Sequence, residues 1–128
     1  MNPEDLKYHR EHTWARIEGN RAKVGITDYA QDSLGEVVYI ELPETGTEVS
    51  AGEDLGEIES TKATSSIISP VAGRVIEVNE DLNDSPEIVN EDPYGRGWIA
   101  VIELDGDSGE GGLLDRKSYD KFVEEETG

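Results

Sequence analysis

Residues 56–70 read GEIESTKATSSIISP and place one basic residue, Lys62, among small and hydroxylated side chains. β-Prone segments around Ile58 and Ile67 lie on either side of the polar stretch ESTKATSS. Such a polar stretch between two strands is typical of a hairpin tip, where loops are exposed and carry function. The sequence therefore predicts that Lys62 projects into water from the tip of a β-hairpin.

Lys62 is isolated in charge as well as in position. The next basic residues are Lys23 and Arg74, and ten carboxylates lie between Lys23 and Lys62: Asp28, Asp32, Glu36, Glu41, Glu44, Glu48, Glu53, Asp54, Glu57 and Glu59. A catalytic lysine is normally buried or placed beside another cation, and neither condition is met here. Lys62 is therefore either an ordinary solvated turn residue or the acceptor for a modifying enzyme, whose active site could close around the small neighbours Thr61 and Ala63.

The bulk composition narrows the classes of function. The chain has 128 residues, which suits one compact domain, and a formal net charge of -19. So acidic a surface repels nucleic acid and anionic membranes, so we expect neither as a partner. The charge fits adaptation to a salt-rich cytoplasm and also fits ordinary acidic solubility, and the sequence leaves both open.

Two absences in the sequence set further expectations. The chain contains no cysteine, so a disulfide framework, a zinc-thiolate site and a thiol nucleophile are all excluded. Any sulfur chemistry must come from an attached group. The N-terminal residues MNPEDLKYHR lack an apolar signal core, and no apolar run approaches membrane length, so we expect a cytoplasmic protein. A monomer is a separate expectation that these absences do not address.

The rest of the chain reads as short strands separated by Gly, Pro and acidic residues, which predicts an all-β sandwich or barrel. We expect strands within 12–19 and 21–27, joined as a hairpin by a turn at Gly19 and Asn20. Further strands are expected within 36–42, 47–60, 66–71, 75–79 and 98–104, with a turn at 72–74 and a loop over 80–97. Thr27 as N-cap and Gly35 as C-terminal residue predict one short helix between them. Residues 105–112 suit a flexible linker to a C-terminal helix at about 113–126, with Leu114, Tyr119 and Phe122 on one face.

Three stretches together resemble a known family. They are VGITDYAQDSLGEVVYIELPETG (24–46), IESTKATSSIISPVAGRVIEVNEDLNDSPEIVNEDPYGRGW (58–98) and the spaced residues Tyr8, His12 and Trp14. In this order they resemble the H proteins of the glycine cleavage system, and the likeness weakens only after about Leu104. The resemblance implies a barrel-sandwich hybrid like those of lipoyl and biotinyl carriers, with residues 1–128 forming a single lipoyl-carrier domain.

The resemblance also implies a specific function. Family members are not enzymes but carry lipoic acid as an amide on a lysine that here corresponds to Lys62. The arm shuttles an aminomethyl intermediate among glycine decarboxylase, aminomethyltransferase and dihydrolipoyl dehydrogenase. Glu59 and Gly73 match family positions linked to recognition by the lipoate-protein ligase or lipoyl transferase. On physical grounds, Glu59 could orient the tip and Gly73 could permit a tight turn.

Two positions depart from the family pattern. The family usually has Glu where this chain has Thr13, and Asp where it has Ser66. Both family carboxylates lie near the cleft that shelters the charged aminomethyl adduct, and a carboxylate stabilises an amine there. Their loss motivates an alternative, in which the arm carries sulfur intermediates beside a heterodisulfide-reductase-like complex, as in H-like lipoate-binding proteins of sulfur oxidation.

Other sites are weaker hypotheses. A biotin carrier is disfavoured because Lys62 is not flanked by methionines, and a lipoyl domain of a 2-oxo acid dehydrogenase would usually be shorter. His9 and His12 have a spacing that binds metal on a helix, but no third histidine or cysteine accompanies them. The aromatic residues Trp14, Trp98, Tyr29 and Tyr39 are expected in or near the core. If Lys62 is never modified, a purely structural module remains.

Overall fold

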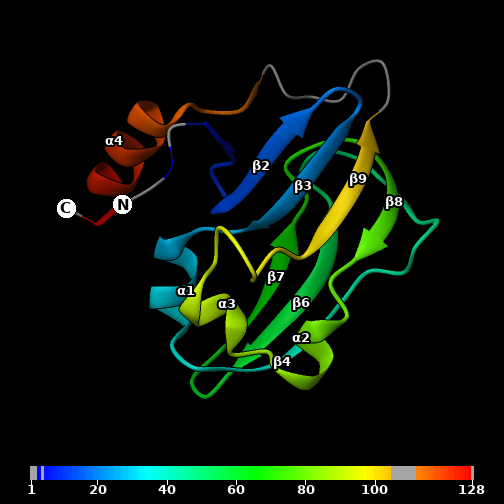
Figure 1. The fold of residues 1–128 in the computed structure, drawn as a ribbon. Helices are drawn as coiled ribbons and strands as arrows, with labels where there is room; N and C mark the ends of the chain where they lie inside the picture. Colours follow the sequence, from blue (N-terminus) through cyan, green and yellow to red (C-terminus); the bar gives the residue numbers. More distant parts are fainter. Residues whose placement is uncertain (1–2, 4, 105–111, 128) are drawn as a thin grey trace.

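The computed structural model describes residue 3, residues 5–104 and residues 112–127, which form two antiparallel β-sheets with short helices around them (Figure 1). The larger sheet has the strand order β1-β2-β3-β9-β8-β5, and the smaller has the order β4-β6-β7. The strands are β1 (Lys7–Tyr8), β2 (Thr13–Glu18), β3 (Arg21–Ile26), β4 (Val37–Glu41), β5 (Glu48–Val49), β6 (Asp54–Ser60), β7 (Thr64–Ile68), β8 (Gly73–Val78) and β9 (Ala100–Leu104). The helices are α1 (Asp28–Leu34), α2 (Asp81–Asp84), α3 (Ile88–Glu91) and α4 (Arg116–Thr127). This architecture confirms the predicted all-β barrel-sandwich fold with short flanking helices.

The main core lies between the two sheets. From Glu57 onward, strand β6 alternates between the two environments, with Ile58 and Ser60 buried and Glu57 and Glu59 exposed. Ile58 belongs to one apolar cluster with residues of the larger sheet such as Ile102. Burying one side chain of this size contributes about 1.5–3 kcal/mol, so this alternation fixes which face of the small sheet turns inward.

The predicted hairpin of the larger sheet is confirmed. Strands β2 and β3 pair antiparallel, with Glu18 opposite Arg21, so Gly19 and Asn20 form a two-residue turn. Gly19 has a φ of 61°. Glycine at the first central position is what a two-residue hairpin turn of the II′ type requires, because other residues are strained there.

The segment 47–60 forms two strands, as expected, but they do not pair with each other. Strand β5 pairs with β8 in the larger sheet, whereas β6 pairs with β4 and β7 in the smaller one. Gly52, with a φ of 90°, lies between them and donates a 2.9 Å hydrogen bond to the Ser69 carbonyl. The chain therefore crosses from one sheet to the other at this glycine, a connection that local residue preferences do not specify.

The expected loop over 80–97 contains the short helices α2 and α3. Leu82, Ile88 and Val89 are buried in the main core, although most of their neighbours in the sequence are polar. Neither helix has a side-chain hydrogen bond at its N-cap. Burial of these three side chains, rather than helix propensity, stabilises the two helical turns, which is why the sequence pattern missed them.

The C-terminal helix is confirmed, but it begins at Arg116 rather than near 113. Leu114 forms a β-bridge with Tyr8, and the Asp115 carboxylate accepts a 2.8 Å hydrogen bond from the Ser118 backbone N–H, which lowers the pKa of Asp115. Tyr119 is fully buried and stacks on Tyr8 at 4.7 Å. Leu114 and Phe122 pack in the same aromatic cluster as Tyr119, as predicted. Most of the expected linker, residues 105–111, lies outside the described residues.

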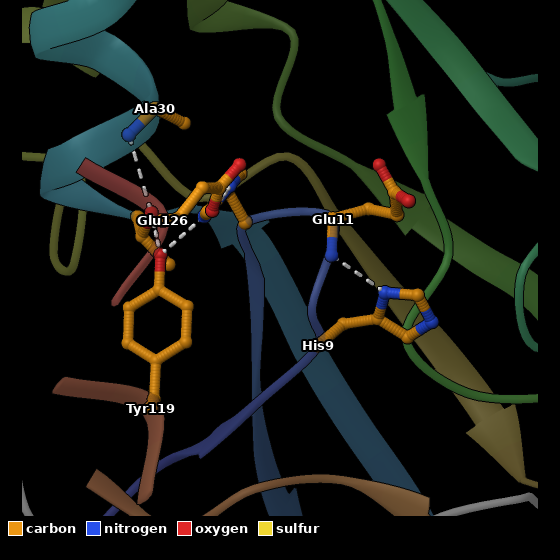
Figure 2. A network of polar contacts seen from close by, with 7 residues as sticks. His9, Glu11, Ala30, Tyr119 and Glu126 are labelled. Carbon is orange, nitrogen blue, oxygen red and sulfur yellow. Dashed lines mark hydrogen bonds and ion pairs between the residues drawn. The ribbon is translucent and has the colours of Figure 1, made fainter. Parts of the chain in front are cut away.

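The Tyr119 hydroxyl joins α4 to the start of α1 (Figure 2). It lies 2.8 Å from Thr27 Oγ1 and 2.8 Å from His12 Nδ1. Thr27 Oγ1 also accepts the predicted N-cap hydrogen bond from the Ala30 backbone N–H, and His12 Nε2 lies 3.1 Å from the Glu126 carboxylate. Burial raises the pKa of Tyr119, so the hydroxyl stays protonated and can donate at neutral pH.

Removing this hydroxyl tests the connection. We expect Tyr119→Phe to lower the free energy of unfolding by about 1–2 kcal/mol, because the ring stack is kept while buried polar partners lose a hydrogen bond. Urea unfolding followed by circular dichroism measures the change. The control is Tyr39→Phe, at a half-exposed tyrosine, which we expect to stay within about 0.5 kcal/mol of wild type. Equal stability of the two variants would contradict this assignment.

Gly73 does not form the expected tight turn but begins strand β8. It is buried and pairs with Leu104 and Val49, and its φ is not positive. A Cβ atom there would overlap the Glu103 carbonyl oxygen and lie 2.8 Å from Ile102 Cγ2. Glycine is therefore required at position 73 by the close approach of strand β9, not by a turn.

We expect Gly73→Ala to lower the free energy of unfolding by on the order of 2–3 kcal/mol, because backbone atoms must move to admit the methyl group. Chemical denaturation measures the loss. Gly112→Ala is the matched control, since nothing lies within 4 Å of a Cβ atom placed at Gly112. A Gly73→Ala protein as stable as this control would show that the strands separate freely at this point.

Candidate functional site

Lys62 lies at the β6–β7 turn and is exposed, as the sequence predicted. Glu59 pairs with Thr64 in the two strands, so Ser60 to Ala63 connect them. The Ser60 hydroxyl accepts hydrogen bonds from the backbone N–H groups of Ala63 at 3.1 Å and Lys62 at 3.3 Å. The turn is therefore fixed by a serine side chain that bonds to its own backbone two and three residues ahead.

The hairpin tip is also attached to the body of the protein. The Thr61 backbone N–H donates a 3.0 Å hydrogen bond to the carbonyl of Glu36. The side chain of Lys62 passes over Gly35, where a Cβ atom would lie 3.3 Å from Lys62 Cε. Gly35 has a φ of 78° and ends α1, as its place in the sequence predicted. The backbone of the tip is thus held in place, while the lysine side chain extends beyond it.

Asn90 of α3 fixes the segment beneath the tip. Its Oδ1 accepts a 2.9 Å hydrogen bond from the Val37 backbone N–H, and its Nδ2 donates to the Gly35 carbonyl at 2.8 Å and to Gln31 Oε1 at 3.0 Å. These contacts join the end of α1 to the start of β4. No local sequence pattern indicates this role, because Asn90 lies 53 residues from Val37 and within a segment expected to be a loop.

A small cleft of about 200 Å³ lies beside the hairpin, at the β7 edge of the small sheet. Its lining residues are Glu11, His12, Tyr29, Ala30, Ser33, Leu34, Ser65, Ser66 and Ile68. Ser66 therefore lines the cleft, in agreement with what the family resemblance implied for this position. Thr13 does not line it: its side chain is buried, and its hydroxyl has no hydrogen-bond partner among the described residues.

Glu11 supplies an acidic group at this cleft, and no sequence motif indicates that role. It lies on a sharp turn, where His12 has a φ of 67° and the Glu11 backbone N–H donates a 3.0 Å hydrogen bond to His9 Nδ1 (Figure 2). Burial lowers the pKa of His9, in keeping with a neutral ring that accepts this bond. The exposed Glu11 carboxylate comes two residues before position 13, where the family usually has glutamate.

The two further recognition candidates lie in different environments. Glu59 is exposed on β6, next to the tip, and its Cα pairs with that of Tyr39 on one side and Thr64 on the other. Gly73 is buried in the larger sheet and cannot itself be touched by another protein. An effect of Gly73 on recognition would therefore act through strand packing, whereas Glu59 can contact a partner directly.

Of the aromatic residues expected in the core, Trp14 is fully buried but Tyr39 is 55% exposed. The prediction for Tyr39 was wrong, because a register shift between Val37 and Tyr39 turns this part of β4 outward. His9 and His12 are engaged in the contacts described above. Within the described ranges, His, Asp and Glu side chains form no group of three or more suited to a metal ion, and no helix there could cross a bilayer.

Comparison with known proteins identifies the family. The sequence model described as "Glycine cleavage H-protein" matches residues 6–126. A glycine cleavage system H protein of Carboxydothermus hydrogenoformans is 51% identical over 124 residues, covering 97% of this chain and 95% of that protein. A mitochondrial glycine cleavage system H protein 2 of Arabidopsis thaliana is 56% identical over 123 residues, covering 95% of this chain and 78% of that protein.

A solved structure agrees with these relatives. The crystal structure of a glycine cleavage system H protein from Mycobacterium marinum superposes with a TM-score of 0.88 at 39% identity, covering 96% of this chain and 99% of the other. The agreement in sequence extends through both sheets, the Lys62 hairpin and the C-terminal helix. This chain belongs to the glycine cleavage H-protein family.

Proposed function

We propose that this protein is the non-catalytic lipoyl carrier of a glycine cleavage system, with lipoic acid joined as an amide to Nζ of Lys62. The observation that carries the proposal is the exposed Lys62 side chain on a hairpin whose backbone is fixed by Ser60 and by Glu36. Family members carry lipoic acid on a lysine. The amine of Lys62 is accessible, and its neighbours Thr61 and Ala63 are exposed and small, so they leave room for acylation.

The attached group would supply a disulfide–dithiol couple, which a chain without cysteine cannot provide itself. Lys62 would hold the arm at one end, and the other end would be free to reach each partner. Such a tether raises the effective concentration of the reactive sulfur at a docked enzyme. A lipoate-protein ligase or lipoyl transferase first attaches the lipoic acid. The loaded protein then exchanges its cargo with the glycine cleavage enzymes, which are glycine decarboxylase, aminomethyltransferase and dihydrolipoyl dehydrogenase.

The cleft beside the hairpin favours an amine as the cargo. Glu11 and Ser66 line it together, so a cationic group resting there would meet a carboxylate even though Thr13 and Ser66 replace the family's acidic residues. A charge-assisted hydrogen bond of this kind stabilises an ammonium group. The alternative of a sulfur cargo rested on the loss of carboxylates, and the relatives described above are named for glycine cleavage. A cytoplasmic location and a monomeric state stay predictions.

The attachment site is tested by coexpression with a lipoate ligase and intact-mass measurement. We expect wild-type protein to gain one lipoyl group and Lys62→Arg to gain none, because the guanidinium group does not form the amide. The arginine keeps the positive charge at the tip, so loss of modification cannot be attributed to a change in charge. An unmodified wild type, or a lipoylated Lys62→Arg protein, would refute the proposal.

The role of Glu11 is tested with the lipoylated protein and glycine decarboxylase. We expect Glu11→Gln to reduce the fraction of aminomethyl-loaded carrier at equilibrium by about threefold to tenfold, since losing a charged hydrogen-bond partner costs about 1 kcal/mol at an exposed site. Glu77→Gln, at an exposed position on β8, is the control and should load like wild type. If Glu11→Gln also loads like wild type, the cleft does not stabilise the amine through this residue.

A further inference from the structure

A second hollow, a groove of about 720 Å³, lies at the opposite edge of the small sheet, between β4 and α3. Its lining residues are Glu36, Val37, Val38, Pro86, Glu87, Asn90 and Glu91. It is separate from the cleft that contains Glu11, because the two share no lining residue. Figure 1 shows α3 beside α1, near the end of the small sheet where the chain turns between β6 and β7.

The strand that lines this groove carries an unusual pair of exposed apolar side chains. Val38 is 47% exposed and Tyr39 is 55% exposed. Among the described residues, these two are the large hydrophobic residues that are exposed. Strand β4 is an edge of its sheet, and the register shift at Val38 turns these side chains away from the core. These two adjacent apolar side chains beside a groove are available for contact with another molecule.

The rim of the groove is acidic. The exposed residues Glu36, Glu87 and Glu91 line it together with the apolar residues Val37, Val38 and Pro86. Glu59 adds a fourth carboxylate, since its Cα pairs with that of Tyr39 on the neighbouring strand. Among the described residues, none of these four carboxylates forms an ion pair. The groove therefore fits a protein surface that presents an apolar side chain flanked by arginine or lysine.

The groove is also attached directly to the base of the Lys62 tip. The Glu36 carbonyl on its rim accepts the hydrogen bond from the Thr61 backbone N–H, and Asn90 on its wall holds Gly35, over which the Lys62 side chain passes. A molecule seated in the groove would thus lie next to the base of the tip that carries the lysine. Partners that act on a loaded arm can bind farther away, because the arm reaches them.

We propose that this groove, with Val38, Tyr39 and Glu59 at its edge, is the docking surface for the enzyme that acylates Lys62. This inference rests on the proposed function. An acylating enzyme must approach an amine that has no arm yet, so it has to contact the surface next to the tip. The surface of that enzyme that contacts the groove pairs an apolar side chain with basic residues. The acidic rim of the groove then increases the rate of encounter at low salt.

The test measures lipoylation of unmodified carrier by a purified lipoate-protein ligase with lipoic acid and ATP. Two independent variants probe the surface: Val38→Ser with Tyr39→Ser removes the apolar contact, and Glu87→Lys with Glu91→Lys reverses the rim charge. We expect each to lower kcat/KM for the carrier by about tenfold or more, mainly through KM, because the Lys62 amine itself is unchanged. All positions substituted are exposed, and thermal unfolding monitors the fold of each variant.

The matched control is Glu44→Lys with Glu77→Lys, which changes the net charge by the same amount at exposed positions outside the groove. We expect it to stay within about threefold of wild type, and the deficit of Glu87→Lys with Glu91→Lys to shrink at high salt. Groove variants that are lipoylated as fast as this control would overturn the inference. Failure of wild type to be lipoylated would instead refute the proposed function.

Two further outcomes would also overturn the assignment. One is that groove variants, once lipoylated, show a raised KM only with glycine decarboxylase, which would make the groove the docking surface for that enzyme. The other is that wild type sediments as a dimer that Val38→Ser with Tyr39→Ser abolishes, which would make the groove a contact between two copies of this chain.

Discussion

The side-chain amide of Asn90 joins α3 to α1 and to the start of β4, the segments on which the site depends. It accepts from the start of β4, donates to the carbonyl that ends α1, and donates to a glutamine within α1. Because Asn90 lies on α3, these bonds form only when Ile88 and Val89 are buried in the main core. Packing far from the hairpin therefore sets the position of the segment that supports Lys62.

This arrangement separates a fixed base from a free amine. Ser60 and Glu36 accept the hydrogen bonds that hold the hairpin backbone, while the Lys62 side chain is exposed and passes over Gly35. A hollow lies at each edge of the small sheet, one with Glu11 and one with an apolar floor and acidic rim. The one lysine of the hairpin therefore lies on a small sheet that has a hollow at each edge.

Local sequence signals predicted the parts of the site whose structure depends on neighbouring residues. Lys62 between two β-prone segments, Thr27 and Gly35 at the ends of α1, and the Gly19 turn are examples, because capping and turn formation involve residues only a few positions apart. Tyr39 was predicted in the core and is exposed, since an irregular register at β4 has no signature in hydrophobic pattern alone.

The sequence by itself determined a cysteine-free, acidic chain of short strands with one amine displayed on a hairpin, because composition and local pattern are sufficient for each of these features. Only the tertiary structure decided that β5 and β6 join different sheets and that Asn90 supports the tip. It also decided that the carboxylate of the cleft comes from position 11, not from position 13. These features depend on contacts between residues distant in the chain. Such contacts form only when the whole core packs, so no short stretch of residues specifies them.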